Sequence, residues 1–403
     1  MLGFLKRRGK SIEQIAEAID GWGGGRNEAG EVVSERTALM EMTVLACVGV
    51  IADACSVPPM QVMRDLGEGR KEHARDLPVY RLLNRRPNEW QTSMEFRETL
   101  TMHAALTGNG YAFPVRDVRD GEIVELIPLM PYMVTIEDRA RYTRIYTIAD
   151  EWGMIARVGP EDIFHLRNRS WDRVRGMNAV NQLSRSIGLS LAAETTASKL
   201  FENGGRASGI LTTESSLSAE AIQRLKAAWG AVSSGNNKFK TAVLDNGMTY
   251  KSLSMSSIDN QLLETRKMQV EVICRGFGVF PQMIGHSDKA ATYASAEAFF
   301  AAHSRQTERK WQENWVQRVD EFILDGAGPL FVEFANQELQ TATLKERGEY
   351  FGKALGSGGG VPWMTQNEVR LASGLQPKEG GDVLREPIAS TIKPEGDGDE
   401  TQA

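Results

Sequence analysis

Three short segments of the sequence contain residue types that support catalysis or phosphate binding. His286-Ser287-Asp288 holds the three side chains of a hydrolytic triad, but adjacent residues rarely converge on one atom and no nucleophile elbow surrounds Ser287. The stretch 348–353 (GEYFGK) is one residue too short for a phosphate-binding loop, and alanine follows its lysine. Gly276-Phe277-Gly278 lacks the third glycine of a dinucleotide loop and is better explained as a helix end. We therefore predict neither a catalytic site nor a nucleotide site.

The cysteines and histidines do not have the spacing of a metal site. The three cysteines are Cys47, Cys55 and Cys274, and no two of them have CxxC spacing. Such an odd, sparse set fits no disulfide pattern, so we expect three small buried apolar residues in a reducing cytoplasm. His103 and His165 are expected to be hydrogen-bonded residues inside their elements. The sequence predicts no metal and no cofactor.

The composition is ordinary for a globular protein and carries no general attraction for DNA. The 403 residues suffice for two or three compact units, and Lys+Arg 47 against Asp+Glu 53 gives a net charge of −6. A protein that grips duplex DNA through its phosphates would have a basic excess, so any DNA contact is expected to be transient. The most apolar stretch, Met42 to Cys55, carries Asp53 and is too short for a bilayer span. We predict a buried helix there and no membrane segment.

The first half of the chain has the pattern of an α+β region. Glycine-rich residues 21–30 separate a mobile N-terminal arm from a helix expected near Leu39–Ala54. Extended chain near Met60–Arg64, a short helix at Val79–Leu83 and a longer helix from the N-cap Ser93 through Leu106 follow. Short strands, which predict antiparallel pairing, are expected at Tyr111–Val115, Ile123–Ile127, Met133–Ile136, Arg144–Ile148, Ile155–Val158 and Ile163–Leu166.

The second half is predicted to be mainly helical. Long helices are expected over Asn178–Phe201, Ile258–Arg275 and Ala294–Leu324. Between the first two helices we expect a strand at Ile210–Thr212, a helix capped by Ser218, and a hairpin around Asp245-Asn246-Gly247.

The C-terminal part is predicted from its caps and its composition. A strand is expected at Phe331–Phe334 and a helix at Thr343–Leu355. Thr365 and Glu368 form a capping box for a further helix. From Glu379 onward the chain is rich in glycine, proline and acidic residues, which predicts a disordered tail.

Two features of the third long helix have both a plain and a functional interpretation. The stripe of Trp311, Trp315, Val319 and Phe322 is more often core than a binding surface. The run Arg305–Lys310 is interpreted as a solvated helix face, with contact to DNA as the alternative.

Several segments, in a fixed order, resemble the portal proteins of tailed double-stranded DNA phages, in the HK-type siphophage branch. The most diagnostic are 277–285 (FGVFPQMIG) and 365–382 (TQNEVRLASGLQPKEGGD). The others are 46–60 (ACVGVIADACSVPPM), 106–112 (LTGNGYA), 163–166 (IFHL), 201–204 (FENG) and 261–266 (QLLETR). The resemblance covers roughly Val44 to Asp382. Met177-Asn178-Ala179 departs from the family's usual Leu-Ser-Pro turn, and Phe280 stands where a second hydrophobic residue or proline is usual, which affects local geometry only.

The resemblance implies an α+β portal fold with an α/β wing, a helical stem, a small α/β clip, a channel loop with a long helix, and a helical crown. Its expected segments are a flexible N-terminal arm at 1–32, the wing at 33–176, stem helices at 177–204 and 258–276, the clip at 205–257, the tunnel loop at 277–293, the long channel helix with a wing strand at 294–340, crown helices at 341–378, and a disordered acidic tail at 379–403.

The resemblance further implies a structural protein and not an enzyme. It would be a head–tail connector in the virion, a ring of about twelve copies at one capsid vertex. Double-stranded DNA would pass through it during packaging by the terminase large subunit and again during ejection. The other partners would be the major capsid protein or a scaffold, and a head–tail adaptor, with assembly in the bacterial host cytoplasm. A prophage or gene-transfer-agent portal is the same class, whereas a cytoplasmic enzyme with an unrecognised site is the alternative from another class.

Two groups of residues would make the functional contacts in such a ring. The channel-loop group is His286, Ser287, Lys289, Thr292 and Tyr293, and the clip group, for motor, adaptor and neighbouring subunits, is Trp229, Asp245, Asn246 and Gly247. Lys289 is the one lysine or arginine in Gly285–Thr292, so its copies would form a weak positive ring around the DNA. The small residues Ala192-Ala193, Ala197 and Ser198 would let the stem helices approach closely.

Overall fold

The computed structural model describes residues 32–384, apart from 69, 140–142, 151–152, 203–208, 214–217, 234–248, 253–255, 287–292, 325, 327, 336–343 and 358. The predicted N-terminal arm and acidic tail therefore fall mostly outside the described residues. The chain divides into two compact units, Met1–Phe334 and Ala335–Ala403. In the described part, no helix has both the length and the apolar character needed to cross a membrane.

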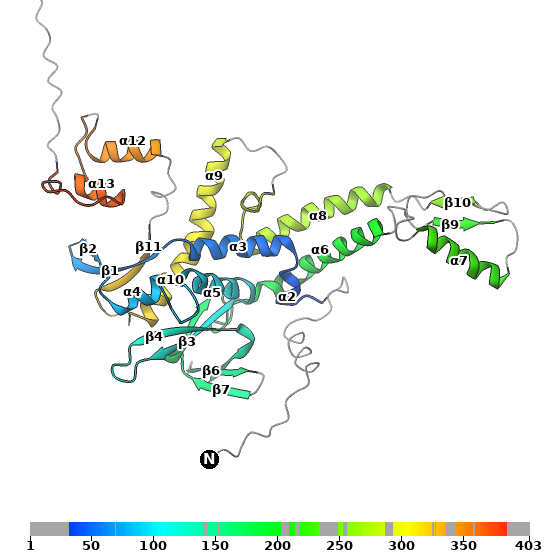
Figure 1. Ribbon diagram of the computed structural model, residues 1–403, viewed down its shortest axis with the longest axis horizontal. Helices are drawn as coiled ribbons and strands as arrows, with labels where there is room; N and C mark the ends of the chain where they lie inside the picture. Colours follow the sequence, from blue (N-terminus) through cyan, green and yellow to red (C-terminus); the bar gives the residue numbers. More distant parts are fainter. Residues whose placement is uncertain are drawn as a thin grey trace, which may run out of the picture. The chain divides into compact units, whose positions relative to one another are not determined.

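The centre of the first unit is the pair of helices α3 (Met42–Ser56) and α5 (Ser93–Thr107), seen in Figure 1. Helix α3 is the apolar helix that the sequence predicted, and the short helix α2 (Glu35–Ala38) precedes it. The N-cap of α5 is Thr92 and not Ser93, because the Thr92 hydroxyl accepts from the Glu95 amide while Glu95 accepts from the Thr92 amide.

The arginine Arg97 of α5 closes the C-terminal end of α3. Its Nη2 donates to the Ser56 carbonyl and its Nη1 to the Pro58 carbonyl, both at 2.8 Å. Burial lowers the pKa of Arg97 to about 10, so its side chain still carries a positive charge at neutral pH. The carbonyls that a helix end and a Pro-Pro turn leave without amide partners are thereby hydrogen-bonded.

The described strands form four small antiparallel sheets. β1 (Met60–Gly67) lies between β11 (Leu330–Phe334) and β2 (Arg70–His73); β3 (Asn109–Arg116) lies between β4 (Ile123–Leu129) and β8 (Phe164–Arg167); β5 (Val134–Arg139), β6 (Thr143–Asp150) and β7 (Gly153–Val158) form a meander; and β9 (Gly209–Thr212) pairs with β10 (Thr249–Ser252). The predicted strands that lie within the described residues, and their antiparallel pairing, are confirmed. The turn of the hairpin predicted around Asp245-Asn246-Gly247 and the strand before that turn lie outside the described residues, and β10 pairs with β9.

Strand β2 was not predicted, because its four residues are all exposed and none is apolar. Ion pairs stand in for a hydrophobic pattern at this edge. Lys71 contacts Glu333 of β11 at 2.5 Å, and Arg64 of β1 contacts Glu72 at 2.7 Å.

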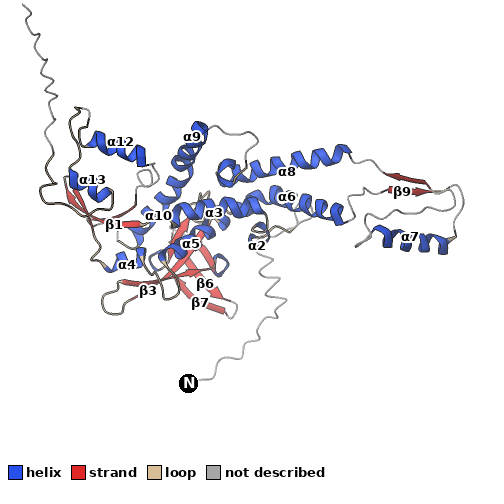
Figure 2. Ribbon diagram, turned by 45° about the horizontal axis from the view of Figure 1, so that its top comes forward, coloured by secondary structure: helices blue, strands red, loops and turns tan. Residues whose placement is uncertain are grey.

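The remaining helices follow the predicted order (Figures 1 and 2). They are α4 (Pro78–Asn84), α6 (Ala179–Glu202), α7 (Ala219–Ser233), α8 (Ser256–Phe277), α9 (Tyr293–His303), α10 (Arg309–Phe322), α12 (Leu344–Ala354) and α13 (Gln366–Ala372). The long helix predicted over Ala294–Leu324 is confirmed as α9 and α10, but the prediction missed the π-helical turn η6 (Ser304–Glu308) that joins them.

The tryptophan stripe of α10 is core, as the plain interpretation predicted. Trp315 is 1% exposed, its ring lies 6.3 Å from Phe96 and 5.6 Å from Phe164, and its Nε1 donates to Thr101 Oγ1 at 2.9 Å. Trp311 is also buried. The run Arg305–Lys310 is solvated only in part, because Thr307 is buried and Glu308 is half-buried.

The second unit has a capped helix held by one buried amide. The Thr365–Glu368 capping box begins α13, as predicted. Asn367 of α13 is buried, donates from Nδ2 to the Lys378 carbonyl and to Asp382 Oδ1, both at 2.8 Å, and accepts from the Lys378 amide. This explains why TQNEVR and GGD occur together in the resemblance: the first motif supplies the amide and the second its partner.

The predicted burial of the cysteines is confirmed, but the two histidine predictions differ in outcome. All three thiols are buried. His165 is hydrogen-bonded on both ring nitrogens, as predicted. His103 is not, because its buried Nδ1 has no hydrogen-bond partner in the described part of the chain. Burial lowers the pKa of His103 to about 4.

Loss of stability in mild acid is expected from this buried imidazole. Between pH 6.5 and 4 the unfolded chain protonates His103 while the folded chain does not, so the free energy of unfolding falls by about 1.4 kcal/mol per pH unit for this group. In the variant His103→Leu, the free energy of unfolding, measured by urea unfolding at several pH values across that range, should fall less steeply with decreasing pH. The exposed His73 provides the control His73→Leu, and an unchanged slope in His103→Leu would contradict the assignment.

Candidate functional site at the paired helices and the loop attachment

Most of the predicted contact residues fall outside the described residues. These are Ser287, Lys289, Thr292, Asp245, Asn246 and Gly247, together with the side chains of Tyr293 at the start of α9 and Trp229 in α7. His286 is described: it is half-buried, and its amide donates to the Pro281 carbonyl at 3.0 Å. The structure therefore describes how the two segments are attached, and leaves their contact residues as predictions.

Helices α6 and α8 lie side by side and bracket the segment that holds β9, α7 and β10 in the sequence (Figure 1). They are in close contact at Gly276, where a Cβ atom would lie 2.4 Å from Leu183 Cδ2. Gly276 is the second-to-last residue of α8, which ends at Phe277, so the predicted helix end at Gly276-Phe277-Gly278 is confirmed. The glycine is needed because a neighbouring helix occupies the space of a side chain.

Both helices are also fixed to α3. The Cys47 thiol of α3 donates to the Cys274 sulfur of α8 at 3.7 Å. Glu41, the N-cap of α3, accepts from the Val44 amide and from Ser190 Oγ of α6. One buried and one partly buried contact thus join the paired helices to the N-terminal half of α3.

The two ends of segment 287–292 are held together. Phe280 precedes the segment, and its ring contacts Phe299 and His303 of α9, which follow it, at centroid distances of 6.5 and 5.6 Å. Thr307 Oγ1 donates to the Gly278 carbonyl at 2.5 Å. Gly278 has φ +74°, which lets the chain turn sharply out of α8.

The π-helical turn η6 supplies the Thr307 contact, and His303, the residue just before the turn, supplies the contact with Phe280. His303 is fully buried, and its Nδ1 lies 3.2 Å from Glu308 Oε1, a hydrogen bond that lowers the pKa of Glu308. The turn also directs the Thr307 hydroxyl at Gly278. Single π turns inside α-helices are common at functional positions. Sequence reasoning missed this turn because the apolar spacing of the helix continues across it.

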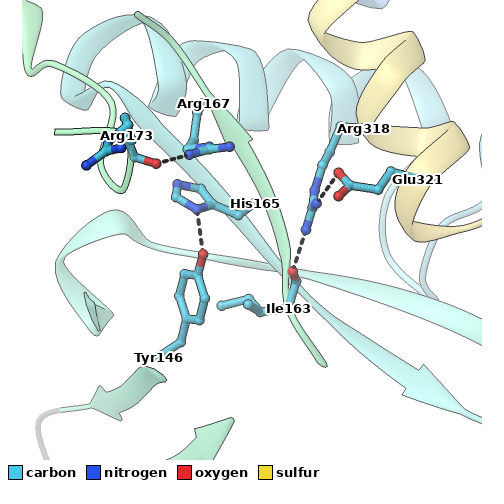
Figure 3. Close-up of polar contacts among 7 residues, drawn as sticks. All are labelled: Tyr146, Ile163, His165, Arg167, Arg173, Arg318 and Glu321. Carbon is cyan, nitrogen blue, oxygen red and sulfur yellow. Dashed lines mark hydrogen bonds and ion pairs between the residues drawn. The ribbon is translucent and has the colours of Figure 1, made fainter. Parts of the chain in front are cut away.

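Side chains on several faces of α10 connect the π-helical turn to the core. Gln312 Nε2 donates to the Ala54 carbonyl of α3 at 2.8 Å. Arg318 donates from Nη2 to the Ile163 carbonyl at 3.1 Å and pairs with Glu321 at 2.8 Å (Figure 3). α10 is therefore fixed to both the helical and the sheet parts of the first unit.

A buried polar network fixes the point where the chain enters α6. Tyr146 Oη lies 3.0 Å from His165 Nδ1 (Figure 3), and His165 Nε2 lies 3.0 Å from Asn109 Oδ1. Burial holds the pKa of His165 well below its usual range, so the ring is neutral, accepts at Nδ1 and donates at Nε2. Asn109 Oδ1 also accepts from the Gly176 amide at 2.7 Å.

The motif 106–112 (LTGNGYA) builds this crossing. Gly108 has φ +84°, and a Cβ on Gly176 would lie within 2.5 Å of the Gly108 backbone. Only glycine allows two backbone segments of the chain to pass so closely. Neither this network nor the rest of the described part of the chain contains a group of three or more His, Cys, Asp or Glu residues placed to bind a metal.

The chain matches a family model described as "Phage portal protein" over residues 42–374. It is 26% identical over 361 residues to the portal protein of Enterobacteria phage HK97, which covers 87% of this chain and 82% of the relative. It is 28% identical over 372 residues to the probable portal protein of Streptomyces phage phiC31, covering 88% of this chain and 78% of the relative.

The fold is also similar to solved structures. A chain from the neck of a native gene transfer agent particle, computed with C12 symmetry, superposes with a TM-score of 0.56 at 22% identity, covering 85% of this chain and 92% of that chain.

The close approach at Gly276 gives a matched pair of substitutions. Alanine is favoured over glycine inside a helix by up to about 1 kcal/mol, so Gly49→Ala in α3, where a Cβ meets no atom within 4 Å, should raise the free energy of unfolding. Gly276→Ala should lower it by about 1 kcal/mol or more, because Leu183 must move.

Urea unfolding of both variants at matched protein concentration measures the difference. Shortening the obstructing side chain in Gly276→Ala/Leu183→Ala should cost less than the sum of the two single substitutions. Equal stabilisation by Gly276→Ala and Gly49→Ala would mean that α6 and α8 are not in contact at this point.

Proposed function

Because the chain belongs to the phage portal protein family, we propose that it forms a ring at one vertex of a DNA-containing particle and serves as the channel through which the DNA passes. The observation that carries this proposal is the match to the family model across residues 42–374. A ring of twelve is supported by the similar gene-transfer-agent chain, whose particle neck was computed with C12 symmetry. An infectious phage, a prophage and a gene transfer agent all fit this class.

The described elements support a division of labour along the chain. α6 and α8 are the stem at 177–204 and 258–276, and the intervening residues 205–257, with α7, β9 and β10, are the clip. Residues 33–176 are the wing, 277–293 the tunnel loop, and 294–340 the channel helix with wing strand β11, which pairs with β1. Residues 341–378, with α12 and α13, are the crown. These assignments give each described element one mechanical role.

The charge of the chain suits a conduit that must not bind its cargo. Each copy carries −6, so a ring of twelve carries a formal −72. Duplex DNA has one charge per about 1.7 Å of its axis. A mainly acidic protein therefore repels DNA at long range. Weak attraction is confined to single positions such as Lys289, which lets the duplex slide.

The family is one of structural proteins, and we propose no catalytic step for this chain. Energy for packaging would come from a terminase large subunit that docks on the clip, and after packaging a head–tail adaptor would use the same region. The wing would contact the major capsid protein or a scaffold. The clip residues Trp229, Asp245, Asn246 and Gly247 remain the proposed contact residues for the motor and the adaptor.

The first expected result is the size of the assembly. Twelve copies of a 44.6 kDa chain give a particle of about 535 kDa, which light scattering and negative-stain imaging measure directly. A ring with a central hole is expected. A compact monomer or dimer under conditions in which the protein is folded would instead favour the cytoplasmic-enzyme alternative and a search for bound ligand.

A second expected result concerns the tunnel loop. Lys289→Ala removes the only lysine or arginine between Gly285 and Thr292, so the positive ring should disappear while assembly remains intact. DNA packaging or retention, measured as nuclease-protected DNA per particle, should change against a Lys345→Ala control, an exposed lysine of α12 outside the tunnel loop and the clip. Loss of the ring in Lys289→Ala would place this lysine at a subunit interface and contradict its position in the channel.

A further inference from the structure

The connection from β8 to α6 has a composition unlike the rest of the chain. Residues 167–175 (RNRSWDRVR), here named the arginine loop, contain four arginines and one aspartate, a charge of +3. The remaining residues therefore carry −9, the difference between −6 and +3. Trp171 in the middle of the loop is 90% exposed. Tryptophan and arginine are both enriched among the residues that contribute most of the binding energy at protein interfaces.

Hydrogen bonds fix the backbone of the arginine loop, so Trp171 is held outward. Asp172 Oδ1 accepts from the Val174 and Arg175 amides at 2.8 and 2.7 Å. Ser170 Oγ donates to the Arg175 carbonyl at 2.6 Å. A loop tied in this way cannot collapse to bury the indole.

Two arginines of the loop serve as ties to the fold. Arg167 donates from Nη1 to the Arg173 carbonyl at 2.7 Å (Figure 3), and Arg175 donates from Nη2 to the Ile136 carbonyl at 2.6 Å. Arg173 itself has φ +67°, a conformation that non-glycine residues rarely adopt. The fold thus maintains a strained backbone that presents Trp171, and such strain is typical of functional segments.

Two cations, Arg169 of the arginine loop and Lys310 of α10, lie close to each other. Arg169 is exposed, and Lys310 of α10 lies near enough that burial and the Arg169 charge lower the pKa of Lys310. Among the described residues, no acidic side chain pairs with Arg169 or Lys310. Two neighbouring cations repel each other, and an anionic partner would relieve that repulsion.

The combination of an indole and cations favours an acidic protein surface over duplex DNA. Contacts to a duplex that carry no sequence information are made to phosphates, which offer an exposed indole no apolar surface. A second copy of this chain offers both requirements, because outside the arginine loop it carries −9 and exposes large apolar side chains. In a closed ring every copy meets a neighbour through two different surfaces.

We propose that the arginine loop is a contact between adjacent copies in the ring, with Trp171 buried against the neighbour and Arg169 paired with its carboxylates. This inference rests on the proposed ring. It gives the loop between the wing and the stem a function: because the loop leads directly into α6, a neighbour bound there also fixes the stem.

Two substitutions at the loop test the contact. Trp171→Ala and Arg169→Glu should each raise the protein concentration at which half of the chains are in rings by about tenfold or more, since 1.4 kcal/mol corresponds to a factor of ten. Mass photometry over a dilution series measures this concentration. Trp90→Ala and Arg119→Glu are the matched controls, because both residues are exposed and lie outside the arginine loop; neither should change it.

Cross-linking identifies the partner directly. Arg169→Lys keeps the charge and adds an amine, which a carbodiimide couples to a carboxylate in contact with it. In rings assembled from a mixture of ¹⁵N-labelled and unlabelled chains, cross-linked peptides from Lys at this position should include pairs with one labelled and one unlabelled member.

The outcomes separate the two proposals. A wild-type protein that forms no ring contradicts the proposed function itself. Wild-type rings that persist unchanged in both loop variants, or cross-links found only within one chain, overturn the loop assignment while the ring stands. Variants that keep the ring but lose binding to a labelled DNA duplex, measured by fluorescence anisotropy, would reassign the loop to DNA and also overturn the proposed contact.

Discussion

The burial of Trp315 is the constraint on which the arrangement of the first unit depends. Its indole contacts Phe96 of α5 and Phe164 of β8, and its one polar atom donates to Thr101. A tryptophan buried so completely can hold only one position, because any shift would separate the N–H from its partner and open a cavity. Helix α10 is therefore fixed relative to both the helical pair and the sheet. Segments that are attached to α10 are therefore held in a fixed position as well.

What is attached to α10 is the part of the chain with the proposed contact with DNA. The π-helical turn joins α9 to α10. Thr307 of the turn and His303 just before it contact Gly278 and Phe280 on the other side of segment 287–292. Both attachments of the segment thus lead back to the core through short paths of buried contacts. The same logic applies to α6, which begins at the crossing of Gly108 and Gly176. A channel that transmits force from a motor requires such fixed attachments.

Sequence patterns predicted the elements whose stabilisation is local or periodic. The apolar run of α3, the stripe of α10 and the Thr365 cap all behave as their patterns indicate, because burial and capping depend on nearby residues. Strand β2 was missed because it has no apolar pattern: backbone pairing with β1 and ion pairs with β1 and β11 hold it. The π turn, the close packing at Gly276 and the unpaired nitrogen of His103 depend on which side chains meet across the fold. No pattern within one segment encodes those contacts between segments. The ring and the channel were predicted from the resemblance to the family, because the residues by themselves did not indicate them.

The distribution of charge addresses the two opposed requirements of the proposed conduit. Copies must adhere to one another, whereas the DNA that passes between them must not adhere to the wall. A uniformly acidic chain would repel DNA but also its own neighbours, and in a ring of twelve that repulsion acts at every interface. Concentrating +3 in nine residues, while the others carry −9, would turn repulsion between copies into attraction at the proposed contact. The rigid backbone around Asp172 keeps that charge where a neighbour can reach it. In this proposal, contact between copies and free passage of the DNA depend on different segments of one acidic chain.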